Sequence, residues 1–166
     1  MTTTIHEAIV ADKPILRNLM QLYRHDFSIY DGSDVDTHGL YDYKYLDLYW
    51  IEATRYPYLV RVEGQIAGLV LLRQGCYDFK TSDEDADLLS IAEFFVLRKY
   101  RRSGVGQFAA QWAFAQFAGR WQVSTPDNNI PAQAFWDKVI ADVSAGAYER
   151  FEADNDVVFQ FINSKS

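Results

Sequence analysis

The centre of the chain joins a strand to a buried helix through a turn that contains two glycines. Residues 90–97, SIAEFFVL, have the apolar character of a strand, and residues 104–119, GVGQFAAQWAFAQFAG, are apolar nearly all round. A helix of that kind has to be covered by other elements, so we expect it to pack against a sheet and to end at Gly119. This feature restricts the chain to a mixed α/β fold.

The remaining hydrophobic periodicity predicts a sheet built mainly of hairpins. The expected order is β-α-α-β-β-β-α-β-α-β-β, with tight turns at residues 63–65 and at Asp154-Asn155. In the strand at 90–97, alternation places Ile91, Glu93, Phe95 and Leu97 on one face. Residues 77–89 are polar and are expected to form a loop. The predicted strands are 4–10, 56–64, 65–75, 90–97, 120–126, 147–153 and 156–163, and the predicted helices are 12–30, 40–56, 104–119 and 130–140. The apolar spacing of 40–56 suits either a helix or an ordered lid, and we assign a helix.

Composition restricts the class of protein. The 166 residues contain no repeat, linker or low-complexity tract, so we expect one domain over residues 1–166. With a single cysteine, Cys76, no export signal and no apolar run of about 18 residues, a cytoplasmic protein without a membrane partner is expected. The net charge of −7 argues against a nucleic-acid partner. The histidines have no metal-ligand spacing, so no metal is expected.

Basic residues gather next to the glycines, which suggests a phosphorylated ligand. Glycines at a helix start let backbone N–H groups approach an anion closely. No Gly-Lys-Ser/Thr ending is present, which excludes a P-loop. Gly104, Gly106 and Ala109 fit the dinucleotide-binding fingerprint, but residues 98–103 separate them from the strand, and too little chain follows for a doubly wound sheet. The alternative is that the glycines only make a turn.

Two segments resemble the GNAT superfamily of acyl-CoA-dependent N-acyltransferases. The stretch from Arg101 to Gly106 matches the family's R/Q-x-x-G-x-G/A loop, and the stretch from Asn129 to Trp136 follows its N-x-x-A-x-x-F-Y segment except at the last residue. The resemblance covers residues from about 90 to 140. It implies a mixed, mostly antiparallel central sheet with a splayed parallel strand pair and helices on both faces.

The resemblance also implies where acetyl-CoA binds. The pyrophosphate would contact the glycine-containing loop, and the pantetheine arm would insert between the strands 90–97 and 120–126 and bond to exposed backbone. Asn129 would bond to that arm, although it is equally suited to cap the following helix. The implied cofactor-binding residues are Phe94, Phe95, Val96, Arg101, Arg102, Ser103, Gly104, Val105, Gly106, Gln107, Asn129 and Phe135.

Glu93 is the candidate catalytic residue. It interrupts an apolar strand face, which costs free energy unless the carboxylate has a partner or a task. In many family members a carboxylate at this position lies at the acceptor site, and a desolvated carboxylate is a suitable base near neutral pH. The alternatives are a solvent-facing side chain or an arginine partner. An aromatic run could shape an acceptor pocket, but packing in the core and on a helix surface explains it equally well; it consists of Tyr41, Tyr43, Tyr45, Tyr49 and Trp50.

The chain departs from the family pattern at Trp136. Family members often have a tyrosine there that protonates the leaving thiolate, and an indole N–H cannot act as that acid. Either the thiolate leaves unaided, another tyrosine serves as the acid, or the chemistry is impaired. The two matching segments together imply an N-acetyltransferase that moves an acetyl group from acetyl-CoA to a primary amine by direct transfer in a ternary complex. The alternative is a CoA-binding module without transfer activity. The sequence leaves open the identity of the small-molecule or peptide amine and the oligomeric state, a homodimer included.

Overall fold

The computed structural model describes residues 1–164 and contains a seven-stranded sheet in the order β1-β2-β3-β4-β5-β7-β6. Neighbouring strands are antiparallel except β4 and β5, which are parallel. The strands are β1 (Thr3–Glu7), β2 (Arg55–Val62), β3 (Gln65–Asp78), β4 (Asp83–Val96), β5 (Gly119–Pro126), β6 (Tyr148–Ala153) and β7 (Asp156–Asn163). The helices are α1 (Lys13–Asp31), α2 (Val105–Phe114) and α3 (Ile130–Ser144), with short 3-10 helices at Val10–Asp12, Leu46–Trp50 and Arg98–Tyr100.

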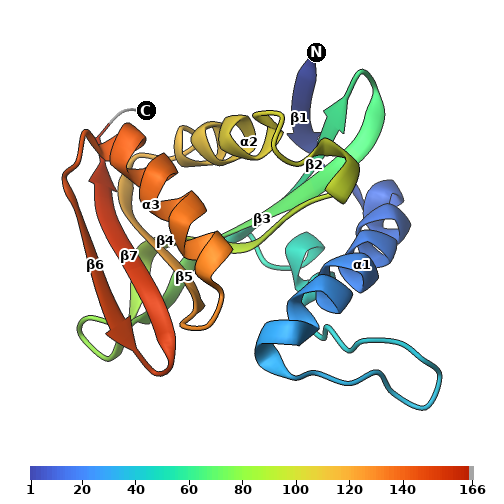
Figure 1. Cartoon of the computed structure of the whole chain (residues 1–166), viewed down its shortest axis with the longest axis horizontal. Coiled ribbons are helices and arrows are strands. Elements are labelled where there is room, and N and C mark those ends of the chain that lie inside the picture. The colour runs from blue at the N-terminus through green and yellow to red at the C-terminus, as the bar shows by residue number, and fades with distance from the viewer. Residues whose placement is uncertain (165–166) are drawn as a thin grey trace.

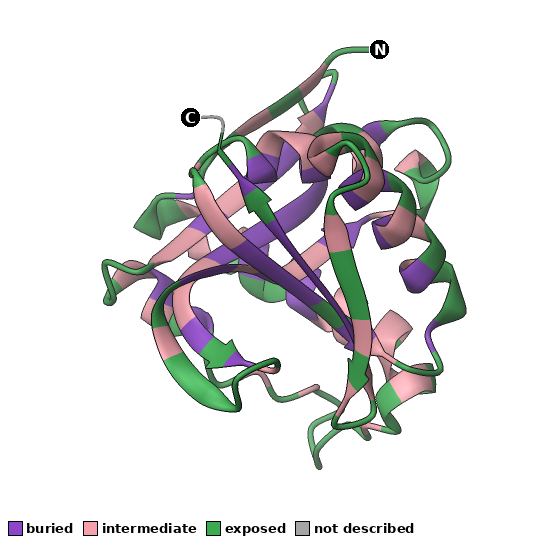
Figure 2. Ribbon diagram, turned by 90° about the vertical axis from the view of Figure 1, so that its left-hand side faces the viewer, coloured by how far each residue is buried: buried purple, intermediate pink, exposed green. Residues whose placement is uncertain are grey.

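Helices cover both faces of the sheet (Figure 1). Apolar residues of α2 and α3 pack with one side of the central strands, and Leu16, Leu19 and Met20 of α1 pack with Leu69 and Leu71 on the other side. Figure 2 shows that burial is concentrated in the central strands between these helices. The mixed, mostly antiparallel fold with helices on both faces is therefore confirmed. Within residues 1–164, none of the helices combines the length and hydropathy needed to span a bilayer.

The parallel strands β4 and β5 pair over only part of their length. Their register contains Leu89 opposite Trp121 and Ser90 opposite Gln122. Beyond this point β4 continues along β3 as far as Val96, and β5 continues along β7 as far as Pro126. The two strands therefore separate toward their C-terminal ends, as the family resemblance implies. Helices α2 and α3 begin shortly after these ends, at the open side of the gap.

A β-bulge in β4 changes which side chains share a face. Leu71 pairs with Glu93, whereas Leu72 pairs with Ile91, so Ala92 is an extra residue on β4. The expectation that Ile91 shares a face with Glu93 is wrong, because the extra residue reverses the alternation. Ile91 packs in the core under α2 and α3.

The segment 40–56 is not the helix that its apolar spacing predicted. It contains only the 3-10 helix Leu46–Trp50, and its start is tied to α1 by reciprocal hydrogen bonds of 2.8 Å between the Gln21 carboxamide and the backbone of Tyr41. These bonds satisfy the backbone without helical turns, while Leu46 and Tyr49 are buried beneath α1. The apolar spacing thus reflects anchoring to a core.

The polar segment 77–89 is mostly strand rather than loop. β3 extends to Asp78 and β4 begins at Asp83, with Tyr77 opposite Glu84, so the two strands form a long hairpin arm. Residues 79–82 make the turn at its tip. The local sequence did not indicate a strand here, because the side chains that bind Asp78 and Asp85 lie far along the chain, on Arg120 and Gln160.

The helix α2 ends at Phe114 and not at Gly119. Gly119 has a φ of 143° and begins β5, where an added Cβ would lie 3.2 Å from the Leu89 side chain. The glycine therefore allows close approach of β5 to β4 at the closed end of the pair. It is not a helix C-cap.

Candidate active site

The loop before α2 carries a row of unused hydrogen-bond donors. Arg102 has a φ of 56°, and Gly104, the N-cap of α2, has a φ of 86°. Among residues 1–164, no acceptor is found for the backbone N–H groups from Arg102 to Gln107. The first turn of a helix leaves such donors free, and the helix dipole adds positive potential there. The loop is therefore suited to bind an anion such as a diphosphate.

Arg101 holds this loop against the rest of the fold. Its Nε donates to the Val96 carbonyl at 2.8 Å, and its Nη2 donates to Asp26 of α1 at 2.7 Å. Arg98 donates to the other oxygen of Asp26, also at 2.7 Å. The exposed Arg102 side chain has no ion pair among the described residues. Arg102 is thus the loop arginine whose charge is available at the mouth of the gap.

The gap between β4 and β5 is bordered by backbone and aromatic side chains. The Phe95 carbonyl faces β3, because it lies next to Gly68, and strand alternation turns the backbone of Phe94 toward the unpaired edge. The Phe94 and Phe135 ring centroids are 5.6 Å apart. An added Cβ on Gly106 would lie 3.4 Å from Phe135. These residues bring together the loop, β4 and α3 at the open end.

Glu93 lies on the α1 face of β4 among tyrosines. Burial raises the pKa of its carboxyl to about 7, although hydrogen bonding from Tyr23 and Tyr43 and the charge of Arg24 favour the ionised form. Tyr23 is on α1, and Tyr43 precedes the 3-10 helix at Leu46–Trp50. Within residues 1–164, Glu93 makes no ion pair within 4.0 Å. The half-buried carboxyl therefore has a pKa close to neutral pH, and in its ionised form it can accept a proton.

A cavity of about 230 Å³ lies at the fork of the gap. Ser90 and Gln122, which form the last parallel pair, both line it, together with Ala92 next to Glu93. A larger cavity of about 290 Å³ is lined by Leu88, Leu89 and Gly119 at the closed end of the strand pair. The smaller cavity is the candidate acceptor pocket, because it lies at the fork of the gap and its lining includes Ala92, the residue before Glu93.

Residues 16–140 match the sequence profile described as Acetyltransferase (GNAT) family. The chain belongs to this family. Enzymes of the GNAT family transfer acyl groups from acyl-CoA. No curated protein matches the chain significantly.

Solved GNAT structures share the fold at low sequence identity. A GNAT acetyltransferase from Streptococcus agalactiae has a TM-score of 0.73 and 14% identity, covering 98% of this chain and 96% of the other. An acetyltransferase from Thermus thermophilus has a TM-score of 0.70 and 14% identity, covering 98% and 97%. Spermidine N-acetyltransferase from Vibrio cholerae, in complex with CoA and spermine, has a TM-score of 0.66 and 11% identity, covering 98% and 96%. At these identities the likeness concerns the fold alone.

The second GNAT segment lies at the start of α3. Asn129 caps this helix, because its Oδ1 accepts from the Ala132 N–H at 3.2 Å, so the capping interpretation is confirmed. No bond from its Nδ2 is found among the described residues, which leaves that donor unused. Trp136 is 6% exposed and packs at 5.1 Å from the Phe94 ring. The indole thus packs as part of the aromatic core beside the gap.

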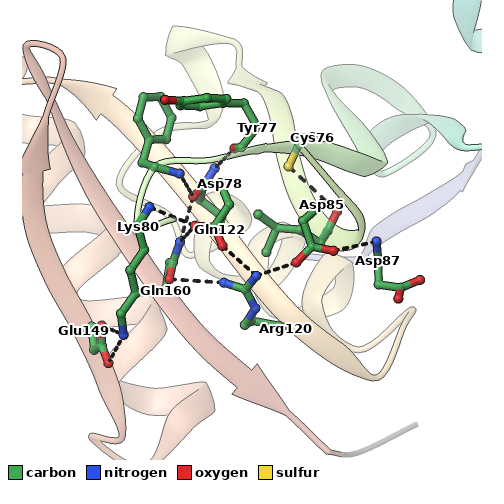
Figure 3. Close-up of polar contacts among 12 residues, drawn as sticks. Cys76, Tyr77, Asp78, Lys80, Asp85, Asp87, Arg120, Gln122, Glu149 and Gln160 are labelled. Carbon is green, nitrogen blue, oxygen red and sulfur yellow. Dashed lines mark hydrogen bonds and ion pairs between the residues drawn. The ribbon is translucent and has the colours of Figure 1, made fainter. Parts of the chain in front are cut away.

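The hairpin arm forms one wall of the candidate acceptor pocket and is fixed by a buried polar network (Figure 3). Asp78 is 0% exposed and accepts from Arg120 and Gln160 at 2.7 Å and from the Lys80 N–H at 2.8 Å. Burial alone would raise the pKa of Asp78, but these donors lower it to about 2. The arm is therefore held rigidly over β5 and β7.

Sequence reasoning identified some of these residues and missed others. The residues proposed for acetyl-CoA lie around the gap and the loop, with Glu93 on the α1 face of the same strand. The aromatic run in the sequence indicates Tyr43 as a possible pocket residue, whereas Tyr23 carries no signal beyond its place in the predicted helix 12–30. Arg73, which lines the pocket at the fork, was also missed. Its signal was a charge inside the otherwise apolar strand QIAGLVLLRQG.

Proposed function

We propose that this chain, as a single cytoplasmic domain over residues 1–166, is an N-acetyltransferase that uses acetyl-CoA and a primary amine in a ternary complex. The observation that carries the proposal is the separation of β4 from β5 beyond Ser90 and Gln122, next to the free N–H groups at the start of α2. An elongated ligand with an anionic middle and a thin tail fits such an arrangement.

In this proposal the loop and the gap hold different parts of acetyl-CoA. The N–H groups from Arg102 to Gln107 bind the pyrophosphate, with charge added by Arg102. The pantetheine arm lies along Phe94–Val96 as an additional strand and contacts Asn129 and Phe135. Arg101 contributes by holding the loop, since its guanidinium is occupied by Asp26 and Val96. The CoA and spermine in the V. cholerae neighbour support this pairing of ligands on the fold.

The chemistry requires a base and an oxyanion donor. Glu93 accepts the proton of the attacking amine, directly or through water, and its pKa of about 7 is suited to that task. A backbone N–H near Phe94 polarises the thioester carbonyl and stabilises the developing oxyanion. Because a thiol ionises at a pKa of about 8.5, the CoA thiolate is a good leaving group without an acid at Trp136.

Thiol release from acetyl-CoA in the presence of a broad panel of amines tests the function. We expect turnover of at least one amine class, and initial-rate lines that intersect when both substrates are varied, as a ternary complex requires. Calorimetry with CoA alone tests the cofactor site independently. Binding of CoA with no turnover of any amine would instead support a CoA-binding module, and absence of CoA binding would refute the site altogether.

The variant Gly104→Ala probes the proposed pyrophosphate loop. Its φ of 86° disfavours any residue with a Cβ, and the loop must then shift its donors. We expect CoA affinity to fall by about tenfold, which corresponds to about 1.4 kcal/mol. Gly64→Ala in the β2–β3 turn, with a φ of 78°, is the matched control for backbone strain away from the site.

A further inference from the structure

Arg73 lines the cavity at the fork and has no partner of opposite charge. The side chain is half-buried on β3, opposite Ser90 of β4. Among residues 1–164, no ion pair or hydrogen bond of its guanidinium is found. The five N–H donors of this guanidinium are therefore available to a ligand. This position therefore favours an anionic ligand.

Among residues 1–164, no carboxylate lies within ion-pair distance of Arg73. The other lining side chains are uncharged: Cys76, Tyr77, Phe79, Ser90, Ile91, Ala92, Gln122 and Ser124. Asp78, on the same hairpin arm, is already bound by Arg120. Gln122 is also occupied, since its Oε1 accepts from Phe79 and Gln160 and its Nε2 donates to the Tyr77 carbonyl. The guanidinium is thus the main unused donor group of the cavity.

Arg73 and Glu93 lie on the same side of the sheet. Ser90 is opposite Arg73 and Leu71 is opposite Glu93, so the two charged residues occupy diagonal positions, separated by the bulge at Ala92. The backbones of diagonal neighbours on antiparallel strands are about 7–8 Å apart, and their Cβ atoms are somewhat closer. Arg24, and not Arg73, is the cation that favours the ionised form of Glu93. A small ligand can therefore bridge the two groups.

We propose that the acceptor is a small primary amine that also carries an anionic group, a carboxylate or a phosphate, which Arg73 binds while the amine faces Glu93. The inference rests on the proposed function and specifies its substrate class. Arginine binds both kinds of anion through paired, charge-assisted hydrogen bonds. The cavity of about 230 Å³ favours a small acceptor, since pockets for drug-sized ligands measure about 300–1,000 Å³.

Matched acceptor pairs test the proposal. The panel compares lysine with cadaverine, tyrosine with tyramine, histidine with histamine, and O-phosphoethanolamine with ethanolamine. We expect at least one anionic member to have a kcat/KM about 10- to 100-fold above that of its partner, as a charge-assisted bond predicts. Arg73→Gln should remove this preference and leave the uncharged partner's kcat/KM within about threefold.

Controls separate recognition from folding and from net charge. Arg61→Gln removes the same charge from β2, outside the cavity lining, and should preserve the preference. Arg73→Lys should restore part of it, because the charge returns without the planar fork. CoA binding and the melting temperature of Arg73→Gln should stay close to wild type.

The outcomes distinguish this inference from the proposed function. Two results would overturn the inference and leave the transferase function standing. One is a higher kcat/KM for the acceptors that lack the carboxylate or phosphate. The other is an equal loss of kcat/KM on both members of a pair in Arg73→Gln. If no amine is acetylated, the transferase function fails, and calorimetry of the anionic compounds with the CoA-bound protein decides the Arg73 site. Binding that Arg73→Gln abolishes supports it, and no binding overturns it.

Discussion

Two acidic side chains on neighbouring strands, Asp78 and Glu93, have opposite electrostatic environments. Asp78 on β3 is 0% exposed, and its pKa is lowered to about 2. Glu93 on β4 is half-buried, and its pKa is raised to about 7. The carboxyl that receives the stronger donors is therefore the more acidic one.

The difference follows from how far the donors of each carboxylate offset its desolvation. Arg120, Gln160 and the Lys80 N–H donate to Asp78 and replace the lost water. Hydrogen bonds from Tyr23 and Tyr43 and the charge of Arg24 favour ionised Glu93, but together they do not offset its desolvation. Desolvation raises the pKa of Glu93 because its donors do not offset it, whereas the donors of Asp78 more than offset the desolvation of that carboxyl. Asp78 is organised for structure, and Glu93 for proton transfer in the proposed mechanism.

Glu93→Gln should have the largest effect on activity. The amide keeps the shape of the side chain but cannot accept the amine's proton, so kcat/KM should fall by about 10²- to 10⁴-fold, the usual contribution of general base catalysis. Thiol release measures the rate. Calorimetry should show unchanged CoA binding.

Glu152→Gln on β6 is the matched control, because this glutamate is exposed on a strand beyond β7. It should retain wild-type rates. A Glu93→Gln enzyme with more than a tenth of wild-type kcat/KM would contradict the base role and leave Glu93 as a binding group.

Asp78→Asn should have the largest effect on stability. It removes the charge that pairs with Arg120, and a shift in pKa from 3.8 to about 2 corresponds to about 2–3 kcal/mol of unfolding free energy at neutral pH. Because the pKa is lowered, this stability is present above pH 3.8 and is lost as the pH falls through 2. Urea denaturation at pH 7 measures the loss.

Asp83→Asn at the exposed start of β4 is the control for charge on the hairpin arm, and it should change the stability by less than about 0.5 kcal/mol. The Glu93 carboxyl should behave in the opposite way. Its pKa is raised, so its contribution to stability is greatest below pH 4.5 and is lost as the pH rises through 7. Equal losses in Asp78→Asn and Glu93→Gln at pH 8 would show that the two environments do not differ as described.

The pH dependence of the rate should report the Glu93 carboxyl. With an acceptor of fixed protonation, kcat/KM should rise about tenfold per pH unit below pH 7 and level off above it, because only the ionised form accepts a proton. Acceptors with amines of different pKa separate this limb from ionisation of the substrate. A limb near pH 4.5 would place the carboxyl in water instead.

Local pattern was sufficient to predict much of the fold, including the glycine-containing loop before α2. The strand–loop–helix order around Gly104 and the hairpin turn at Asp154-Asn155 depend on backbone conformations that few residues adopt, and the two residues of that turn have φ values of 52° and 65°. The sequence therefore carries their signal directly. Glu93 is a candidate from sequence alone because a charge in an apolar strand is costly.

Features that depend on distant partners were not predicted. The bulge at Ala92 arises from the register with β3, and residues 77–89 become strand because Arg120 and Gln160 satisfy Asp78. Tyr23 reaches Glu93 only through the docking of α1 on the sheet. Hydrophobic periodicity contains no information about such pairings, so these contacts emerge only in the assembled fold.

Tyr23→Phe should have the smallest effect and should sharpen the comparison most directly. The ring keeps its contacts with Phe95 at 5.6 Å and Phe27 at 5.7 Å, while the hydroxyl that favours ionised Glu93 is lost. The pKa of Glu93 should therefore rise further, moving the acidic limb of the rate profile by about half a unit to higher pH. The pH profile of kcat/KM measures this shift.

Tyr43→Phe should move the limb in the same direction by less, because its hydroxyl contributes less to the pKa of Glu93 than that of Tyr23. Tyr41→Phe removes a hydroxyl that lies 3.3 Å from His25, and it should leave the limb in place. A shift to lower pH in Tyr23→Phe would mean that the hydroxyl stabilises the protonated carboxyl. In that case the tyrosine hydroxyls would not be what keeps Glu93 ionised above pH 7. The difference in pKa between Glu93 and Asp78 would then depend on desolvation alone.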